Sequence, residues 1–379
     1  MLRTNGYIKN LKASNATAIF ISTLLVSIFI IATLNFVIDP GQIYLLKIRN
    51  EQNSANLGKT LFKSKYGIVQ SGWGERTVKT NLARHAAEFD CVIIGSSHVM
   101  QFSSVRNMSI NNKCTSFLNL GVSGGALEDI AIFSYLVTDS LFKPNNVFIA
   151  IDPWTIKMGM DGRWAENESI YTSMMSRINL HDNGLDRPYI YKKITNLINY
   201  DYLKSSLESL KKNGLLASWA TATKSSSLLN QPILAEEFDF EEGFKDPVTL
   251  PDGSHAYEAD FIRSSRIKPI PMGGGDYKIS GPSHTDDGIT LLLKIIKVLR
   301  SDGVEVSFIM TPYHENVFLM GETETVKHIR EVSSVVLKLS QKHNIPIYGS
   351  FYPNELKCTA NEFFDFMHPK SSCLNKIVF

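Results

Sequence analysis

A serine, an aspartate and a histidine in this chain have the types and order that nucleophilic catalysis needs. Ser97 follows the short apolar run 91–94 and Gly95, and Asp365 and His368 lie three residues apart near the C-terminus. An activated serine needs a base to take its proton and a carboxylate to orient that base. Ser96 or Ser97 is therefore a candidate nucleophile, and His368 and Asp365 are a candidate base and carboxylate for it. The alternative for the serine is that it only caps the next helix.

Acyl chemistry at a serine also needs N–H donors for the oxyanion. A second apolar run, 116–120, ends in the glycine-rich turn 121–125, whose backbone amides few side chains obstruct. We predict that this turn supplies backbone N–H donors of that kind. The turn could equally be a tight connection between a strand and a helix.

The elements that must position these residues follow an α/β pattern. Apolar runs of strand length alternate with segments of helix length, which predicts a parallel sheet with right-handed crossovers. Ligands bind beyond the carboxyl ends of such strands, where Ser97 and His368 would then meet. The expected strands are 90–95, 116–120, 147–151, 304–310 and 345–348, and the expected helices are 127–141, 285–301 and 322–343.

This alternation breaks over residues 155–280, which are rich in Ser, Lys, Asn, Tyr and Asp and contain no strand of the earlier kind. We expect one long insertion on the carboxyl edge of the sheet, since long insertions there are usually lids or partner surfaces. Residues 86–379 would form the domain that carries this insertion. Residues 39–85 would form a stalk and a lead-in helix.

The N-terminal segment predicts a membrane anchor. Residues 17–38 contain no charge and are long enough to cross the hydrocarbon core of a bilayer. Residues 1–16 carry three basic side chains and no acidic one, which places them in the cytoplasm and the rest of the chain outside, in the periplasm or at the cell surface. The alternative, a cleaved signal peptide, would have a shorter apolar region and a small-residue cleavage site.

Composition narrows the class of protein. The net charge of the 379 residues is +2, with no basic stripe that would favour nucleic acid. The cysteine and acidic spacing indicates no metal site, and we expect no cofactor. In an extracytoplasmic domain, a Cys358–Cys373 bridge would hold the loop around Asp365 in place. Cys91 and Cys114 could be buried thiols, and the state of all four cysteines stays open.

Together, three blocks of the sequence resemble the SGNH (GDSL-like) hydrolase superfamily. The blocks are Gly95-Ser96-Ser97, Asn119 to Gly124, and Asp365-Phe366-Met367-His368. The resemblance covers residues 86–152 and 284–370. It implies a three-layer α/β/α flavodoxin-like fold. It also implies Ser97 as the nucleophile, His368 as the general base, Asp365 as the group that orients it, and the Ser97 and Gly124 amides as oxyanion donors.

One departure from the family concerns the oxyanion hole. The family's third block offers an Asn side chain after the third strand, whereas this chain has Asp152-Pro153-Trp154 there. An ionised Asp152 only accepts hydrogen bonds, and proline has no N–H. Either another donor substitutes, such as the Trp154 indole, or the oxyanion hole is weaker. Candidate substrate contacts are Asn119, Asp152, Trp154, His314 and His98.

An N-terminal anchor followed by Gly-Ser-Ser is similar to bacterial envelope acyl-transfer proteins, such as the D-alanyl-lipoteichoic acid transfer protein and the accessory proteins of polysaccharide O-acetyltransferases. The resemblance implies acyl transfer, most simply O-acetylation, to a cell-envelope glycan, with a multi-pass membrane acyltransferase as partner. A carbohydrate esterase with the same triad is one alternative. A non-catalytic scaffold is another, which a separation of the three side chains beyond about 6 Å would favour.

Overall fold

The computed structural model describes most of the chain and divides it into two units. The described residues are 4–38, 57–69, 74–106, 108–139, 143–179, 195, 197–223, 233–235, 243–267, 270, 281–319 and 321–379. One unit comprises residues 1–49 and 187–226, and the other comprises residues 50–186 and 227–379. Part of the predicted insertion is therefore grouped with the N-terminal segment, and most of the predicted lead-in region is grouped with the α/β domain.

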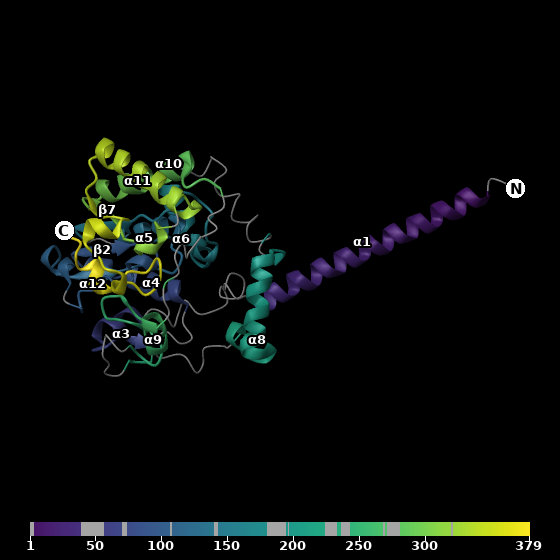
Figure 1. Cartoon of the computed structure of the whole chain (residues 1–379), viewed down its shortest axis with the longest axis horizontal. Helices are drawn as coiled ribbons and strands as arrows, with labels where there is room; N and C mark the ends of the chain where they lie inside the picture. The colour runs from purple at the N-terminus through teal and green to yellow at the C-terminus, as the bar shows by residue number, and fades with distance from the viewer. Residues whose placement is uncertain are drawn as a thin grey trace. The chain divides into compact units, whose positions relative to one another are not determined.

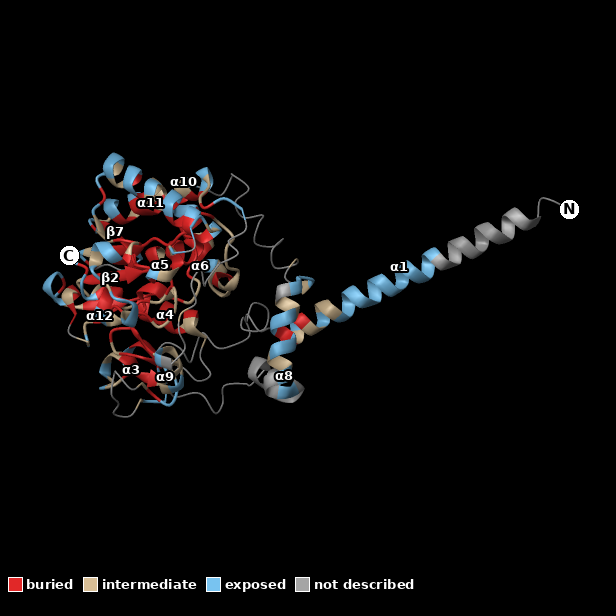
Figure 2. Ribbon diagram, viewed as in Figure 1, coloured by how far each residue is buried: buried red, intermediate tan, exposed pale blue. Residues whose placement is uncertain are grey.

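The first unit contains a long apolar helix. Helix α1 runs over Thr4–Ile38, and its segment Thr17–Ile38 is long and apolar enough to span a membrane (Figure 1). Most side chains of this segment are exposed, as the pale blue of α1 in Figure 2 shows. Helix α8, Tyr200–Thr223, packs against α1, and the Asn35 side chain bonds to the Leu197 carbonyl and the Ser206 hydroxyl, both at 2.9 Å.

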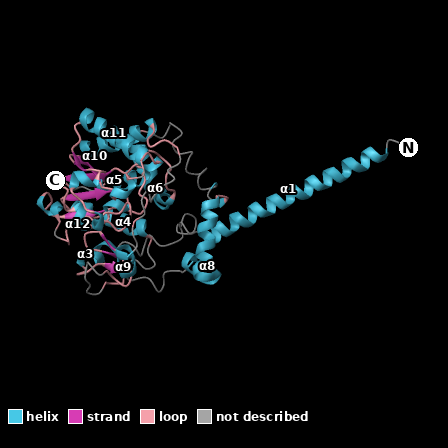
Figure 3. Ribbon diagram, viewed as in Figure 1, coloured by secondary structure: helices cyan, strands magenta, loops and turns pink. Residues whose placement is uncertain are grey.

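The second unit is built on a five-stranded parallel sheet, drawn in magenta in Figure 3. Its strands lie in the order β3-β2-β4-β7-β8, which is 2-1-3-4-5 along the sheet's own strands and is a common order of doubly wound folds. The predicted parallel α/β sheet is thus confirmed. The bounds are β2 Cys91–Ile94, β3 Phe117–Asn119, β4 Asn146–Ala150, β7 Glu305–Met310 and β8 Ile347–Gly349.

Amphipathic helices cover one face of this sheet. Helix α10 buries Leu291, Leu292, Ile295, Ile296 and Leu299, which form one stripe at helical spacing, and it packs on α5 and β7. A hydroxyl begins α10, because the side chain of Thr285 accepts from the third amide of this helix. The helices on this side are α5 Leu127–Thr138, α10 Asp286–Ser301 and α11 Glu324–His343, with α6 Glu168–Arg177 packed on α5.

The opposite face packs on the C-terminal segment. Ile93 and Phe148 of the sheet share a buried cluster with Leu374 and Ile377, which lie in and just after helix α12, Ser371–Leu374. The Cys91–Cys114 disulfide lies in the same cluster and joins the start of β2 to the loop before β3. The state of these two cysteines, which the sequence left open, is therefore a disulfide, with both sulfurs inside one apolar layer.

A second, smaller sheet combines one strand from the predicted stalk region with two strands from the predicted insertion. Strand β1 pairs antiparallel with β5, and β5 pairs antiparallel with β6. The described part of the insertion therefore contains short strands, and residues 57–69 belong to the α/β unit. The bounds are β1 Ile68–Val69, β5 Val248–Thr249 and β6 His255–Ala256, with helices α3 Leu57–Lys63, α4 Glu75–Ala83 and α9 Ala259–Ile267 nearby in the chain.

Candidate active site

The nucleophile candidate lies at the carboxyl end of a central strand. Strand β2 ends at Ile94, and Ser97 begins a short 3₁₀ helix, Ser97–Val99. Gly95 lets the backbone pass close to Ala150 of the neighbouring strand, because a Cβ at position 95 would lie 2.5 Å from the Cβ of Ala150. The hydroxyl of Ser96 accepts the His98 N–H and so caps this helix. The capping role belongs to Ser96, and the half-buried Ser97 hydroxyl is left for another partner.

That partner is the imidazole of His368. The distance from Ser97 Oγ to His368 Nε2 is 2.9 Å, and His368 Nδ1 lies 2.7 Å from Asp365 Oδ2. Because an ionised carboxylate only accepts, Nδ1 carries the proton and Nε2 accepts the serine hydroxyl. Both distances are well below the separation that would favour a scaffold. The three side chains have the mutual geometry of a catalytic triad.

The charge on Asp365 is stabilised locally. Burial alone would raise the pKa of this carboxyl, but the hydrogen bond and charge of His368 oppose it, and the backbone N–H groups of Met367 and His368 each donate to Oδ1 at 2.8 Å. The balance lowers the pKa of Asp365 to about 2. The carboxylate is therefore ionised at neutral pH and can hold the imidazole in one tautomer.

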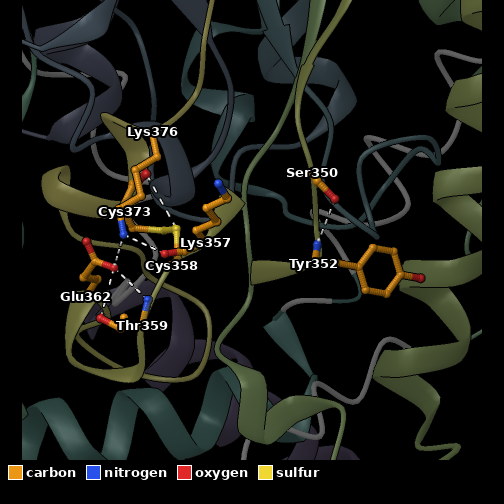
Figure 4. The surroundings of a disulfide bond; sticks show 8 residues. All are labelled: Ser350, Tyr352, Lys357, Cys358, Thr359, Glu362, Cys373 and Lys376. Atoms are coloured by element: carbon orange, nitrogen blue, oxygen red, sulfur yellow. Dashed lines mark hydrogen bonds and ion pairs between the residues drawn. A yellow bond between two sulfur atoms is a disulfide. The ribbon is translucent and has the colours of Figure 1, made fainter. Parts of the chain in front are cut away.

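A disulfide closes the loop that carries Asp365 and His368. Cys358 and Cys373 are bonded, as the sequence predicts for an extracytoplasmic domain. Figure 4 shows Glu362 beside this disulfide, where its carboxylate accepts from Lys376 Nζ at 2.6 Å and from the Thr359 amide at 2.7 Å. Within the loop, the Phe364 N–H donates to the His368 carbonyl at 2.9 Å. The disulfide thus joins the two ends of the loop that carries Asp365 and His368, and the hydrogen bond between Phe364 and His368 spans its middle.

The two predicted oxyanion donors have no hydrogen-bond partner in the described part of the chain. Among the hydrogen bonds of the described residues, none uses the N–H of Ser97 or of Gly124, and both residues line one cavity. Gly124 has φ +59°, a left-handed conformation that favours glycine, and a Cβ there would lie 2.6 Å from Nη2 of Arg163. Two unpaired amides beside a serine hydroxyl are suited to bind the oxyanion of a tetrahedral intermediate.

Two arginines bond to the peptide that contains the Gly124 amide. Nη2 of Arg163 donates to the Ser123 carbonyl at 2.8 Å, and Nη2 of Arg76 donates to the same oxygen at 3.2 Å. Arg76 is buried and also forms two 2.8 Å bonds to Asp129. Burial opposes its charge, but Asp129 outweighs that effect and raises the pKa of the guanidinium. Two cationic donors on the Ser123 carbonyl polarise the peptide group that this carbonyl shares with the Gly124 N–H. The Gly124 N–H is therefore a stronger hydrogen-bond donor.

The cavity in front of the triad has a volume of about 590 Å³, within the range of small-molecule sites. The sheet's carboxyl edge and the triad loop form one part of its wall. Residues of the predicted insertion form much of the rest. The lining residues are Glu75, Ser97, Met100, Ser123, Gly124, Trp154, Met160, Asp161, Arg163, Pro247, His255, Tyr257, Glu258, Phe261, Asp365 and His368.

Of the candidate substrate contacts, only Trp154 lines this cavity. Its indole N–H donates to the Gly125 carbonyl at 3.3 Å, so this donor is engaged in the turn and does not stand in for the missing third-block Asn. Asn119 is fully buried elsewhere. Its amide donates to the carbonyls of Val99 and Phe102, and its Oδ1 accepts from Gly121, so it shapes the turn and does not contact substrate.

The other three candidates lie behind the cavity wall. His98 and Asp152 are both buried and form a pair with 2.9 Å between Nδ1 and Oδ1. The His98 ring also packs edge-on against His368, with 5.4 Å between ring centroids, so it supports the base from behind. His314 is buried, and its Nδ1 accepts the Asn316 N–H at the start of a 3₁₀ helix. None of these three residues lines the cavity, so its geometry gives no support to the expectation that they contact substrate.

Several cavity residues were not predicted from the sequence. Asp161, Arg163, Tyr257 and Phe261 come from the insertion, where no periodic pattern marks them. The one local pattern that could have indicated a polar site is the spacing of Asp161 and Arg163, two residues apart, which form a 2.6 Å ion pair. Among the described residues, no group of three or more His, Cys, Asp and Glu side chains is arranged to hold a metal.

Comparison with known proteins adds no assignment. No protein-family model and no curated protein matches this chain. The chemistry of the cavity is therefore argued from the geometry of its own residues.

Proposed function

We propose that this chain is a membrane-anchored serine acyltransferase of the SGNH type that O-acetylates a cell-envelope polysaccharide. The observation that carries the proposal is the continuous chain of hydrogen bonds from Ser97 through His368 to Asp365. It lies at a cavity lined by Ser97 and Gly124, whose amides have no partner among the described residues. The strand order is the flavodoxin-like order that the resemblance to this superfamily implies.

The first half of the proposed reaction loads the serine. Ser97 Oγ attacks the carbonyl carbon of an acetyl donor while His368 Nε2 takes the hydroxyl proton. The amides of Ser97 and Gly124 bind the oxyanion, and Asp365 stabilises the imidazolium through Nδ1. When the intermediate collapses, the bond to the donor's leaving group breaks and His368 returns the proton to that group. The product is acetyl-Ser97.

The second half transfers the acetyl group. A sugar hydroxyl attacks the ester carbonyl of acetyl-Ser97, and His368 Nε2 takes the hydroxyl proton. Collapse forms the O-acetyl sugar and gives the proton back to Ser97 Oγ. Water in place of the sugar would give acetate, so transfer and hydrolysis differ only in which hydroxyl reaches the ester.

The proposed location follows from the anchor and the disulfides. An apolar helix of membrane-spanning length precedes the α/β unit, and this unit contains two disulfides, which persist in oxidising compartments. We place the α/β unit outside the cytoplasmic membrane. Acetyl thioesters are cytoplasmic, so the donor must cross the membrane, and a multi-pass membrane acyltransferase would supply it.

The test captures the acetyl-enzyme. The full-length chain in lipid nanodiscs is incubated with p-nitrophenyl acetate and digested, and the Ser97 peptide is analysed by mass spectrometry with and without polysaccharide acceptors. Ser301→Ala, a change of an exposed serine on α10, is the matched control for Ser97→Ala. An acetyl adduct on Ser97 that passes to a sugar supports the proposal. Discharge to water alone would support the esterase, and no adduct on a folded chain would support the scaffold.

A further inference from the structure

One wall of the cavity comes from a small sheet that is fixed beside the nucleophile. The His255 N–H of β6 donates to the carbonyl of Met100, three residues after Ser97, at 2.9 Å. In the preceding turn, the buried Asp252 accepts from the Ser103 hydroxyl at 2.7 Å. These hydrogen bonds hold this part of the insertion against the segment that carries Ser97, so the insertion forms a fixed wall of the cavity.

This wall presents a cluster of aromatic rings. Tyr257 lies 4.6 Å from Phe261 and 4.8 Å from Phe364, measured between ring centroids. All three side chains are half-buried, and Phe364 directly precedes Asp365. Tyr257 and Phe261 line the cavity. The cluster therefore joins the insertion to the triad loop and offers aromatic surface next to the reacting atoms.

The cavity is poor in free positive charge. Its lining residues include the carboxylates Glu75, Asp161, Glu258 and Asp365, and Arg163 is the only arginine or lysine among them. Arg163 is already paired with Asp161 at 2.6 Å and bonded to the Ser123 carbonyl. Lys79 and Arg106 lie close to His255, but both donate to backbone carbonyls and neither lines the cavity, so its lining offers more carboxylate acceptors than cations. Burial lowers the pKa of His255 to about 3, so its ring adds no positive charge at neutral pH.

We infer that the wall formed by Pro247, His255, Tyr257, Glu258, Phe261 and Phe364 is an acceptor subsite for an uncharged sugar residue, and that anionic polymers are poor acceptors. This inference rests on the proposed transferase function. Aromatic rings offer a flat apolar surface to the C–H face of a sugar ring, and carboxylates accept from its hydroxyls. Lys370 Nζ lies 5.5 Å from the centre of the Phe364 ring, but it donates to the Asn361 carbonyl and does not line the cavity. A uronate or phosphate group in the cavity would therefore meet the like charge of the lining carboxylates.

The test measures binding without turnover. The full-length chain carrying Ser97→Ala, in lipid nanodiscs, is titrated by calorimetry with two neutral tetrasaccharides, of N-acetylglucosamine and of mannose, and with the anionic tetragalacturonate. Phe261→Leu keeps most of the apolar volume but removes the ring. Phe318→Leu is the matched control, because Phe318 is also half-buried and packs on one aromatic ring, that of Tyr352, outside the cavity.

The expected result is binding of a neutral tetrasaccharide that Phe261→Leu weakens roughly 2- to 10-fold and Phe318→Leu leaves unchanged. Tetragalacturonate should bind more weakly, and Glu258→Gln should narrow that difference. Equal or tighter binding of tetragalacturonate, an unchanged affinity in Phe261→Leu, or no binding of either neutral sugar at millimolar concentration would each overturn the inference. Because this protein lacks the Ser97 hydroxyl, failure here is separate from failure of the acetyl-enzyme experiment.

Discussion

Arg163→Met should slow acylation of Ser97 even though Arg163 lies outside the triad. Arg163 and Arg76 both donate to the Ser123 carbonyl, whose peptide group also contains the Gly124 N–H. Methionine keeps an unbranched apolar side chain but cannot donate to that carbonyl. The variant therefore removes the shorter of the two bonds that polarise the proposed oxyanion donor and leaves the Arg76 bond in place.

The magnitude follows from the strength of the oxyanion contact. Loss of a whole oxyanion donor costs about 2.7–4 kcal/mol. A hydrogen bond on one side of a peptide strengthens the bond on its other side by about 10–30%. The expected loss is then about 0.3–1.2 kcal/mol, which corresponds to a decrease of roughly 2- to 8-fold in kcat.

The assay is steady-state release of p-nitrophenol from p-nitrophenyl acetate by the full-length chain in nanodiscs. Arg177→Met is the control, because Arg177 forms a 2.7 Å ion pair with Asp302 and its side chain is 33% exposed, against 39% for Arg163, but it does not line the cavity. We expect Arg163→Met to lower kcat with little change in KM. An unchanged kcat, or a change in KM alone, would refute the polarisation of the Gly124 amide.

The triad loop and a buried carboxyl give three more expectations. Asp365→Asn removes the acceptor that fixes the His368 tautomer, so kcat should fall about 10⁴-fold with a melting temperature close to that of the parent chain; a near-normal kcat would contradict the assignment. Replacing Cys358 and Cys373 together by serine opens a loop with a sequence separation of 15 residues. Guanidinium denaturation of the α/β unit should then show a loss of about 3 kcal/mol. Burial raises the pKa of Glu166 from 4.5 to about 7, so its contribution to stability is present below pH 4.5 and is lost as the pH rises through 7. Glu166→Gln should therefore raise the melting temperature more at about pH 8 than at about pH 5, and equal shifts would argue against this.

The sheet and the triad were predictable from short local patterns. The apolar run that ends at Gly95 marks a strand buried on both faces, and the structure places β2 at Cys91–Ile94, inside the sheet between β3 and β4. Asp365 and His368 are close in sequence, so their contact needs only one turn of chain. Their approach to Ser97 across 271 residues follows from the rule that parallel strands present their carboxyl ends at one edge.

The cavity wall was not predictable because its contacts are distant in sequence and its segments lack periodicity. The bond from Arg163 to Ser123 spans 40 residues, and the segments that hold them carry no repeating apolar pattern. Tyr257 and Phe261 lie four apart at the start of a helix and could equally have been core residues. The Cys91–Cys114 disulfide was missed for a related reason, since a cysteine in an apolar run is most simply a buried thiol.

Labelling by a fluorophosphonate tests the central claim most directly, because this reagent reacts with an activated serine hydroxyl. The full-length chain in nanodiscs is treated with the reagent alongside Ser97→Ala and the control Ser301→Ala. The account predicts stoichiometric labelling that Ser97→Ala abolishes and Ser301→Ala leaves intact. Absence of labelling in a folded parent chain, or equal labelling of Ser97→Ala, would contradict the assignment of Ser97 as an activated nucleophile.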